Sequence, residues 1–230
     1  MSMLTEISYN HPLFRQRAYT LLEILAKDGI SLQVELAYRF GATSSNPNFN
    51  RLIKRLCDHD LIITHTLPLG VVNKVSVVQL TDYGKERMAQ MGVPPIESEY
   101  ERILRLHDGA NQPKHTAQVL FTAYQARIRG LKVSVMPFEK DDGTPWYQPD
   151  LEITNGYLTY PVEVETHSRN KPEKWLYKRE ANVVLPNPKI RQLVVERLKR
   201  LGVPGRATDL RTLALLHRRG NLSTFWLERW

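Results

Sequence analysis

Three acidic side chains near the middle of this 230-residue chain have the types and spacing to do chemistry. Asp150 follows a proline and opens a short apolar run, and Glu163 comes thirteen positions later, two residues before Glu165. Side chains alternate between the two faces of a strand, so Glu163 and Glu165 fall on one face and Val164 on the other. If the two runs pair as a hairpin, all three carboxylates meet at one end of it.

Like charges so close together repel strongly, and a bound divalent cation is the simplest relief. We therefore expect Asp150, Glu163 and Glu165 to hold Mg²⁺ or Mn²⁺, ions that bind carboxylates together with phosphate oxygens and water. A site of that kind suits the hydrolysis of a phosphodiester bond. The alternative is an ordinary salt-bridge network, in which Glu163 or Glu165 pairs with cations such as Lys174 and Lys178.

Three further side chains are candidates for the same site. His115 opens a predicted helix, and its ring either faces the carboxylates, where it positions water or phosphate, or lies in solvent. Lys174 and Lys178 are one helical turn apart, so they either stabilise the reacting phosphate or only bind the DNA backbone.

The histidines are scattered along the sequence without a closely spaced trio, which favours attack by water over attack by a tyrosine.

The second half of the chain combines strand and helix patterns around these residues. The acidic runs form a hairpin about a turn at 154–156, because Thr-Asn-Gly is typical of a tight turn. The predicted elements are, in order, a helix over 115–129, strands over 131–137, 148–153 and 157–166, a strand over 181–187, a helix over 188–201 and a strand or helix over 210–216. This pattern is typical of the α/β class.

The first half predicts a different unit. Its expected elements are, in order, helices over 14–27, over 31–40 with Ser31 as N-cap, and after Asn46-Pro47, then strands over 61–67 and 74–81 and a helix over 82–91. Three helices, a hairpin and a helix is the order of a winged helix-turn-helix. The Gly-Val-Pro-Pro run at 92–95 and the acidic residues through Glu101 indicate a linker.

The third helix of this first unit carries the candidate DNA-binding residues. Its outward face is polar and basic, which suits base edges and phosphates in the major groove, and a cation on the hairpin suits the DNA backbone. The residues are Asn48, Asn50, Arg51, Lys54 and Arg55 on the helix, and Lys74 on the hairpin. The alternative is a protein-docking role, because residues 1–100 hold ten basic and ten acidic side chains.

Charge is distributed unevenly along the chain. The formal net charge is +8, but residues 166–230 alone hold 15 Lys and Arg against 5 Asp and Glu. A basic surface directly after the acidic cluster attracts polyanions, of which nucleic acid is the commonest in a cytoplasm.

The single cysteine excludes a disulfide framework, and the absence of a long apolar run predicts a cytoplasmic protein without membrane contact.

Pro149-Asp150 followed by Glu163-Val164-Glu165 resembles the core of the PD-(D/E)XK nucleases, the restriction-endonuclease-like enzymes. The resemblance implies a mixed sheet flanked by helices, with Asp150 and Glu163 as metal ligands and the Val164 carbonyl as a third. The sequence departs from that pattern at Glu165, where the family has lysine. Either Lys174 or Lys178 replaces that lysine, or the site is impaired.

The layout of the whole chain is similar to replication-relaxation proteins and to the MobC-type relaxases of mobilisable plasmids. That resemblance implies a winged helix-turn-helix over 1–95 and a nuclease-like domain over 96–230. It also implies a strand-nicking relaxase that acts at a plasmid transfer origin, with accessory mobilisation or coupling proteins as further partners. Two other functions stay open: a non-enzymatic replication or transcription regulator with a relic nuclease domain, and a transposon or restriction endonuclease that cuts both strands.

Overall fold

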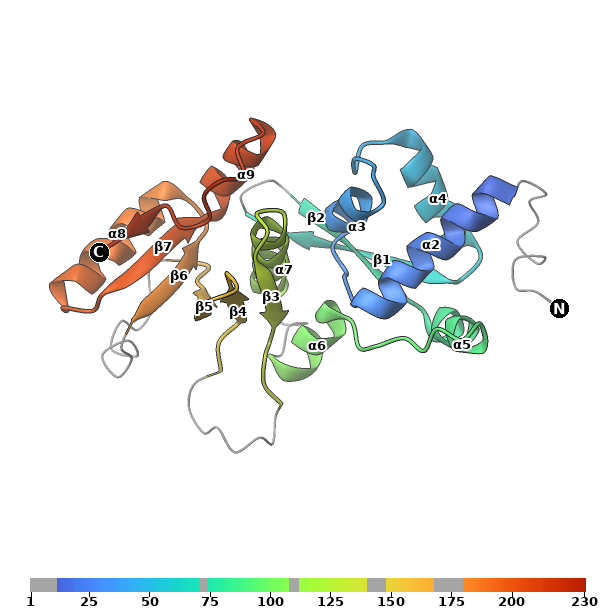
Figure 1. Ribbon diagram of the computed structural model, residues 1–230, viewed down its shortest axis with the longest axis horizontal. Coiled ribbons are helices and arrows are strands. Elements are labelled where there is room, and N and C mark those ends of the chain that lie inside the picture. The colour runs from blue at the N-terminus through green and yellow to red at the C-terminus, as the bar shows by residue number, and fades with distance from the viewer. Residues whose placement is uncertain (1–11, 71–73, 108–111, 140–147, 168–179) are drawn as a thin grey trace. The chain divides into compact units, whose positions relative to one another are not determined.

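The computed structural model describes residues 12–70, 74–107, 112–139, 148–167 and 180–230. In these residues the fold is mixed α/β, as expected, with eight helices, a two-stranded hairpin and a six-stranded mixed sheet (Figure 1). The chain divides into two compact units. The first unit is Met1–Leu67 with Val75–Arg102, and the second is Pro68–Lys74 with Ile103–Trp230.

The first unit consists mainly of helices around one apolar core. Its elements are α2 (Pro12–Asp28), α3 (Gln33–Arg39), α4 (Pro47–Asp58), the hairpin strands β1 (Ile62–Pro68) and β2 (Lys74–Leu80), and α5 (Asp82–Gln90). The predicted helix after Asn46-Pro47 is confirmed as α4. The Asn46 side chain caps it by accepting from the N–H groups of Asn48 and Phe49, and Phe49 and Leu52 are buried in the core.

The N-cap predicted at Ser31 is wrong. Helix α3 begins after Leu32, which has no side-chain oxygen to cap it. Ser31 is fully buried instead, and its hydroxyl oxygen accepts a hydrogen bond from the Tyr100 N–H at 3.2 Å. A serine hydroxyl can accept a hydrogen bond from any nearby N–H group, not only from the helix that follows it. Here the donor is 69 residues away in sequence.

Helix α6 (Glu99–Leu106) includes residues that the sequence indicated as linker. Ser98 and Glu101 form a capping box at its start: the Glu101 N–H donates to the Ser98 hydroxyl at 3.3 Å, and the Ser98 N–H donates to the Glu101 carboxylate at 2.9 Å. Side chains from α5 and β2, Lys85 and Gln79, also donate to Glu101. Helix α6 ends one residue before His107.

The second unit is built on the six-stranded sheet, in the order β3-β4-β5-β6-β7-β8. Strands β3 to β5 are antiparallel, β5 to β7 are parallel, and β8 is antiparallel to β7. The strands are β3 (Lys132–Val135), β4 (Leu151–Thr154), β5 (Thr159–Val164), β6 (Ala181–Leu185), β7 (Gly205–Asp209) and β8 (Glu228–Arg229). The predicted hairpin of acidic runs is therefore confirmed as β4 and β5.

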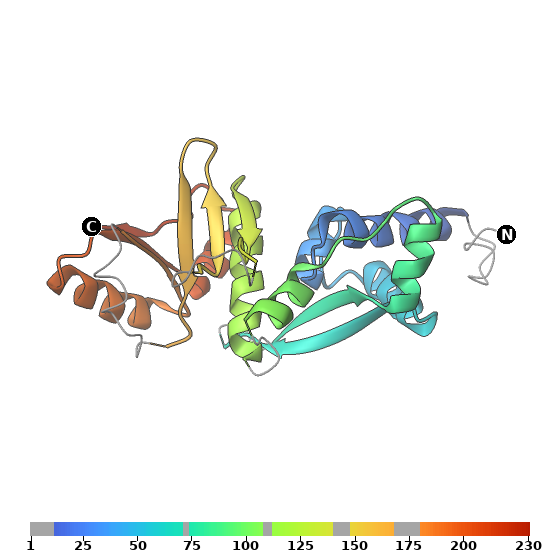
Figure 2. The same ribbon diagram turned by 90° about the horizontal axis from the view of Figure 1, so that it is seen from below.

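Helices α7 (Pro113–Arg127), α8 (Pro188–Arg200) and α9 (Leu210–Arg218) cover this sheet. Helix α7 lies alongside β3, β4 and β5 (Figure 2), and α8 packs on β6 and β7. Every residue of β6 is buried, which is typical of a central parallel strand with both faces covered. Among the described residues, no helix is both long enough and apolar enough to cross a lipid bilayer.

Candidate metal centre

Asp150 lies immediately before β4 and is held there by two backbone hydrogen bonds. Its carbonyl oxygen accepts from the Met136 N–H at 3.0 Å, and its carboxylate oxygen Oδ2 accepts from the Val164 N–H at 2.7 Å. The residue is only 3% exposed. A buried carboxylate costs free energy unless other groups compensate its charge, so the fold must supply further partners for Asp150.

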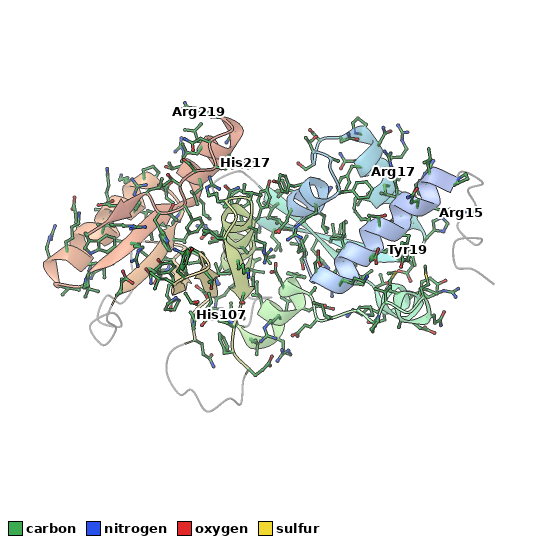
Figure 3. The ribbon with its side chains drawn as sticks, viewed as in Figure 1. Arg15, Arg17, Tyr19, His107, His217 and Arg219 are labelled. Carbon is green, nitrogen blue, oxygen red and sulfur yellow. The ribbon has the colours of Figure 1, made fainter. Side chains whose placement is uncertain are left out.

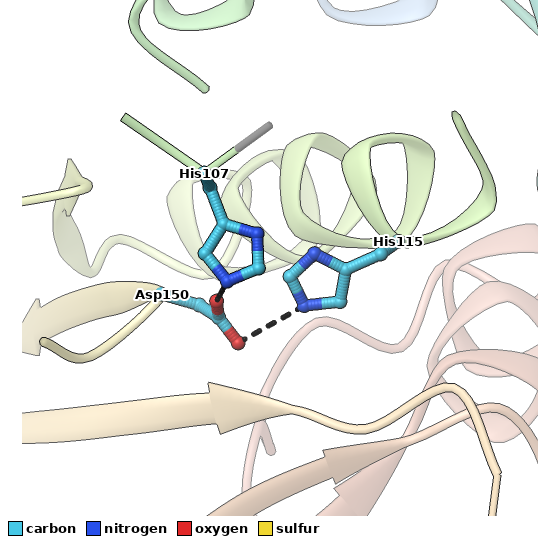
Figure 4. A group of neighbouring side chains, drawn as sticks. All are labelled: His107, His115 and Asp150. Carbon is cyan, nitrogen blue, oxygen red and sulfur yellow. Dashed lines mark hydrogen bonds and ion pairs between the residues drawn. The ribbon is translucent and has the colours of Figure 1, made fainter. Parts of the chain in front are cut away.

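Two histidine rings supply those partners (Figure 4). His115 lies in the first turn of α7, and its Nε2 is 3.3 Å from Asp150 Oδ2. His107 follows α6, where its N–H donates to the Ile103 carbonyl, and its Nε2 is 3.8 Å from Asp150 Oδ1. The rings are stacked, with centroids 4.7 Å apart and planes 22° apart. Each carboxylate oxygen thus faces one imidazole nitrogen.

This arrangement is slightly wider than a bound metal ion requires. One ligand atom from each of His107, His115 and Asp150 lies within 4.8 Å of the other two. Around a tetrahedral ion with bonds of about 2.1 Å, neighbouring ligand atoms are about 3.4 Å apart. The two nitrogen-to-oxygen distances, 3.8 Å to Oδ1 and 3.3 Å to Oδ2, are near that value, but each ends on a different carboxylate oxygen, so the side chains must move for one ion to bind all three.

The electrostatics of the cluster favour positive charge. Burial lowers the pKa of His115, but the hydrogen bond and the charge of Asp150, a backbone hydrogen bond at Val164 and the charge of Glu163 outweigh burial, so the pKa is raised above its ordinary value. In the described part of the chain, the buried Nδ1 atoms of His107 and His115 have no hydrogen-bond partner. The site therefore attracts a cation, whether a proton or a metal ion.

Of the three predicted acidic residues, the described structure brings Asp150 into the group of ligand atoms, and Glu163 is close enough for its charge to act on His115. Leu151 pairs with Val162 across the hairpin, so Asp150, one position earlier, comes opposite Glu163. Val164 is buried, whereas Glu163 and Glu165 are half-buried, as the alternation of a strand predicts. The Glu165 N–H donates to the Val184 carbonyl at 2.9 Å, which continues the β5–β6 pairing. The predicted Lys174 and Lys178 lie outside the described residues.

His107 is the candidate ligand that the sequence did not predict. It is eight residues from His115 and 43 from Asp150, which is no recognised metal-ligand spacing. The only local signal was a histidine at the end of one helix and another at the start of the next. His115 itself is 8% exposed and faces Asp150, not solvent.

The types of ligand atom in this group indicate which metal ion it would bind. Two imidazoles and one carboxylate suit Mn²⁺, Fe²⁺ or Zn²⁺ better than Mg²⁺, which prefers oxygen ligands and keeps several waters. Without an ion, the same residues form a His–Asp pair, in which the carboxylate orients an imidazole that accepts or donates a proton. Both arrangements support hydrolytic chemistry.

The predicted DNA-binding residues of α4 differ in how far they are free to reach a partner. Asn48, Asn50, Arg51 and Lys54 are exposed, and Arg55 is half-buried with its guanidinium over the Phe14 ring. The Asn50 side chain already donates to the Ser44 carbonyl and accepts from Gln33. Lys74 is exposed at the first position of β2.

No known protein family, no curated protein and no solved structure matches this chain.

Proposed function

We propose that this protein is a divalent-metal-dependent DNA endonuclease that nicks one strand, of the relaxase type that acts at a plasmid transfer origin. The observation that carries the proposal is buried Asp150, opposite Glu163 in the hairpin and faced by the Nε2 atoms of His107 and His115. Such a constellation at the end of two strands suits an ion that binds both protein and phosphate oxygens.

The topology of the second unit supports this proposal. Helix α7, the antiparallel strands β3, β4 and β5, and the parallel strand β6 follow one another in the chain, with Asp150 before β4 and Glu163 in β5. A mixed sheet with acidic residues on these two strands is what the resemblance to PD-(D/E)XK nucleases implies. The basic excess of residues 166–230 suits a polyanionic substrate.

The first unit supports DNA recognition. Its order of α2, α3, α4, the β1–β2 hairpin and α5 is the order expected of a winged helix-turn-helix. Helix α4 presents Asn48, Arg51 and Lys54 to solvent, and these side-chain types read base edges and bind phosphates. We infer that α4 enters the major groove near the cleavage site.

The residues of the metal centre have separate tasks in this mechanism. Asp150 is fixed by the Val164 N–H and holds the ion together with Glu163, and the imidazoles of His107 and His115 add nitrogen ligands and orient the carboxylate. A bound divalent ion neutralises charge that develops on the scissile phosphate and makes water a better nucleophile. In this proposal the half-buried Glu165, next to Val164 in sequence, orients water.

A nicking assay tests the proposal. Supercoiled plasmid that carries the DNA flanking the gene is incubated with the full chain and Mn²⁺, Mg²⁺ or a chelator. We expect open circles with Mn²⁺, less product with Mg²⁺, and none with chelator. Asp150→Asn should reduce the nicking rate by at least about 100-fold, whereas Asp82→Asn, an exposed aspartate on α5, should not change it.

The alternatives give different products. Linear DNA identifies a double-strand endonuclease, and equal nicking by wild type and Asp150→Asn contradicts the proposed site. Circular dichroism of the variant, unchanged from wild type, shows that lost activity is not lost folding.

One observation favours a second candidate function, a DNA-binding regulator without enzymatic activity. Both carboxylate oxygens of Asp150 already face protein nitrogens, so protein groups can compensate the negative charge of Asp150 without a bound ion. If the protein is such a regulator, a chelator should not change its binding to DNA. Calorimetric titration with Mn²⁺ should then show no saturable binding.

A further inference from the structure

A hollow of about 620 Å³ lies in the first unit, among α2, the end of α3 and the start of α4. Its volume is in the range of small-molecule sites. Three of the lining residues are aromatic: Phe14 from α2, Phe40 from the end of α3, and Phe49 from α4, which is almost fully buried. The rings of Phe40 and Phe49 are tilted against each other, with centroids 5.8 Å apart.

Three arginines lie around this apolar lining, and no carboxylate is among the lining residues. They are Arg17 from α2, and Arg51 and Arg55 from α4 (Figure 3 labels Arg17). Within the described residues Arg17 makes no hydrogen bond or ion pair, and Arg51 donates only to the neutral side chain of Asn48, at 3.5 Å. The positive charges of Arg17 and Arg51 at this hollow, without an ion pair among the described residues, favour an anionic ligand.

The chemistry of the lining narrows the ligand class. Guanidinium groups bind phosphate in a bidentate manner, and three of them match a phosphomonoester, with a charge of about −1.5 to −2, better than a single carboxylate. Phenylalanine rings and arginine planes both stack on flat aromatic systems. A ligand that combines a phosphate with an aromatic ring satisfies both parts of the hollow.

We propose that this hollow binds a nucleotide, with the phosphate on Arg17 and Arg51 and the base against the half-buried Phe14 and Phe40. The nucleotide is either free or the 5′-terminal residue of a DNA strand, since both have the same chemistry. None of the metal-centre residues takes part, so the site goes beyond the proposed nuclease activity and is testable without it. Since Arg51 is on α4, an occupied hollow competes with base reading by that residue.

Calorimetric titration of the full chain with deoxyadenosine 5′-monophosphate, in chelator, tests the proposal. We expect saturable binding, and binding at least about tenfold weaker for the nucleoside deoxyadenosine, which lacks the phosphate. Arg17→Gln and Arg51→Gln should each weaken nucleotide binding about tenfold. Lys27→Gln removes a cation from the same helix as Arg17 but outside the hollow, and should leave the affinity unchanged.

A 5′-phosphorylated single-stranded oligonucleotide separates the two sources. Displacement of the mononucleotide by the oligonucleotide, weakened by Arg17→Gln, assigns the hollow to a strand end, and failure to displace it assigns a free nucleotide. Three results overturn the proposal: no saturation up to millimolar nucleotide, equal affinity for nucleotide and nucleoside, or equal weakening by Lys27→Gln and Arg17→Gln. Since Arg17 and Arg51 are exposed, these variants should fold as wild type does.

Discussion

Glu101 is the carboxylate whose charge the fold of the first unit stabilises most clearly. Burial by itself raises the pKa of Glu101, but hydrogen bonds from Lys85, from the backbone and side chain of Ser98, and from Gln79 outweigh burial and lower the pKa to about 2. These partners come from α5, the start of α6 and β2. Loss of the Glu101 charge should therefore loosen three elements at once.

The size of the effect follows from that shift. A fall in pKa from 4.5 to about 2 corresponds to at most about 3 kcal/mol at neutral pH. The side chain of Glu101 is 18% exposed, and solvent screening reduces the value, so we expect about 2 kcal/mol. Since the folded pKa is the lower one, this stability is present above the ordinary pKa and is lost as the pH falls toward 2. More than half should be gone by pH 3.

Urea unfolding of wild type and Glu101→Gln at pH 7 and pH 3 measures this prediction. Far-ultraviolet circular dichroism is the appropriate signal, because all four tryptophans lie after residue 103 and report on the second unit. We expect Glu101→Gln to be about 2 kcal/mol less stable at pH 7 and the difference to shrink by more than half at pH 3. Glu86→Gln, an exposed change on α5, should have little effect at either pH.

A difference between wild type and Glu101→Gln that stays constant from pH 7 to pH 3 would refute the reasoning. It would mean that the hydrogen bonds of Glu101 stabilise the unit without depending on its charge.

The other predictions concern the second unit and α5. In protein freed of metal, the pKa of His115 measured by NMR should lie above its ordinary value, and in Asp150→Asn it should fall below that value, because burial is then uncompensated. The stability that charged His115 contributes should accordingly be lost as the pH rises. An unchanged His115 pKa in the variant would contradict the pairing with Asp150. Asp209 is fully buried, caps α9 and pairs with Arg191 at 2.6 Å. Asp209→Asn should therefore lower the free energy of unfolding, measured in urea, by about 3 kcal/mol. A decrease of less than about 1 kcal/mol would show that the ion pair contributes little. In Gly84→Ala the new Cβ would lie 2.1 Å from the backbone oxygen of the residue before β1, so we expect a loss of about 2 kcal/mol, and an unshifted unfolding midpoint would count against that close approach.

Much of the local structure was predictable because its causes are close together in sequence. Helix α4 has a capping asparagine, a proline at its first position and apolar residues three and four apart, so its start and its buried face are both encoded locally. The β4–β5 hairpin follows from a tight turn between alternating runs, and this turn also determines that Asp150 comes opposite Glu163.

The contacts that prediction missed are mostly between residues far apart in sequence. Ser31 has the composition of a helix cap, but its hydroxyl accepts from Tyr100, which only the folded first unit brings near. Glu101 looked like one acidic residue of a linker, although the Ser98-x-x-Glu101 spacing of its capping box is a local signal of a helix start. Its contact with Lys85, like that of Ser31 with Tyr100, is not visible in a local pattern, because it depends on packing between elements.

The sequence by itself determined the acidic hairpin, the basic excess after it and most of the order of helices and strands, though not α6 or β8, since periodicity, turn residues and charge are properties of short segments. Only the tertiary structure decided that His107 joins His115 at Asp150, because α6, α7 and β4 converge there from separate parts of the chain. The hollow with three arginines is likewise a product of packing between α2 and α4. Ligand sets and cavities depend on distances across a fold, which residue spacing alone does not specify.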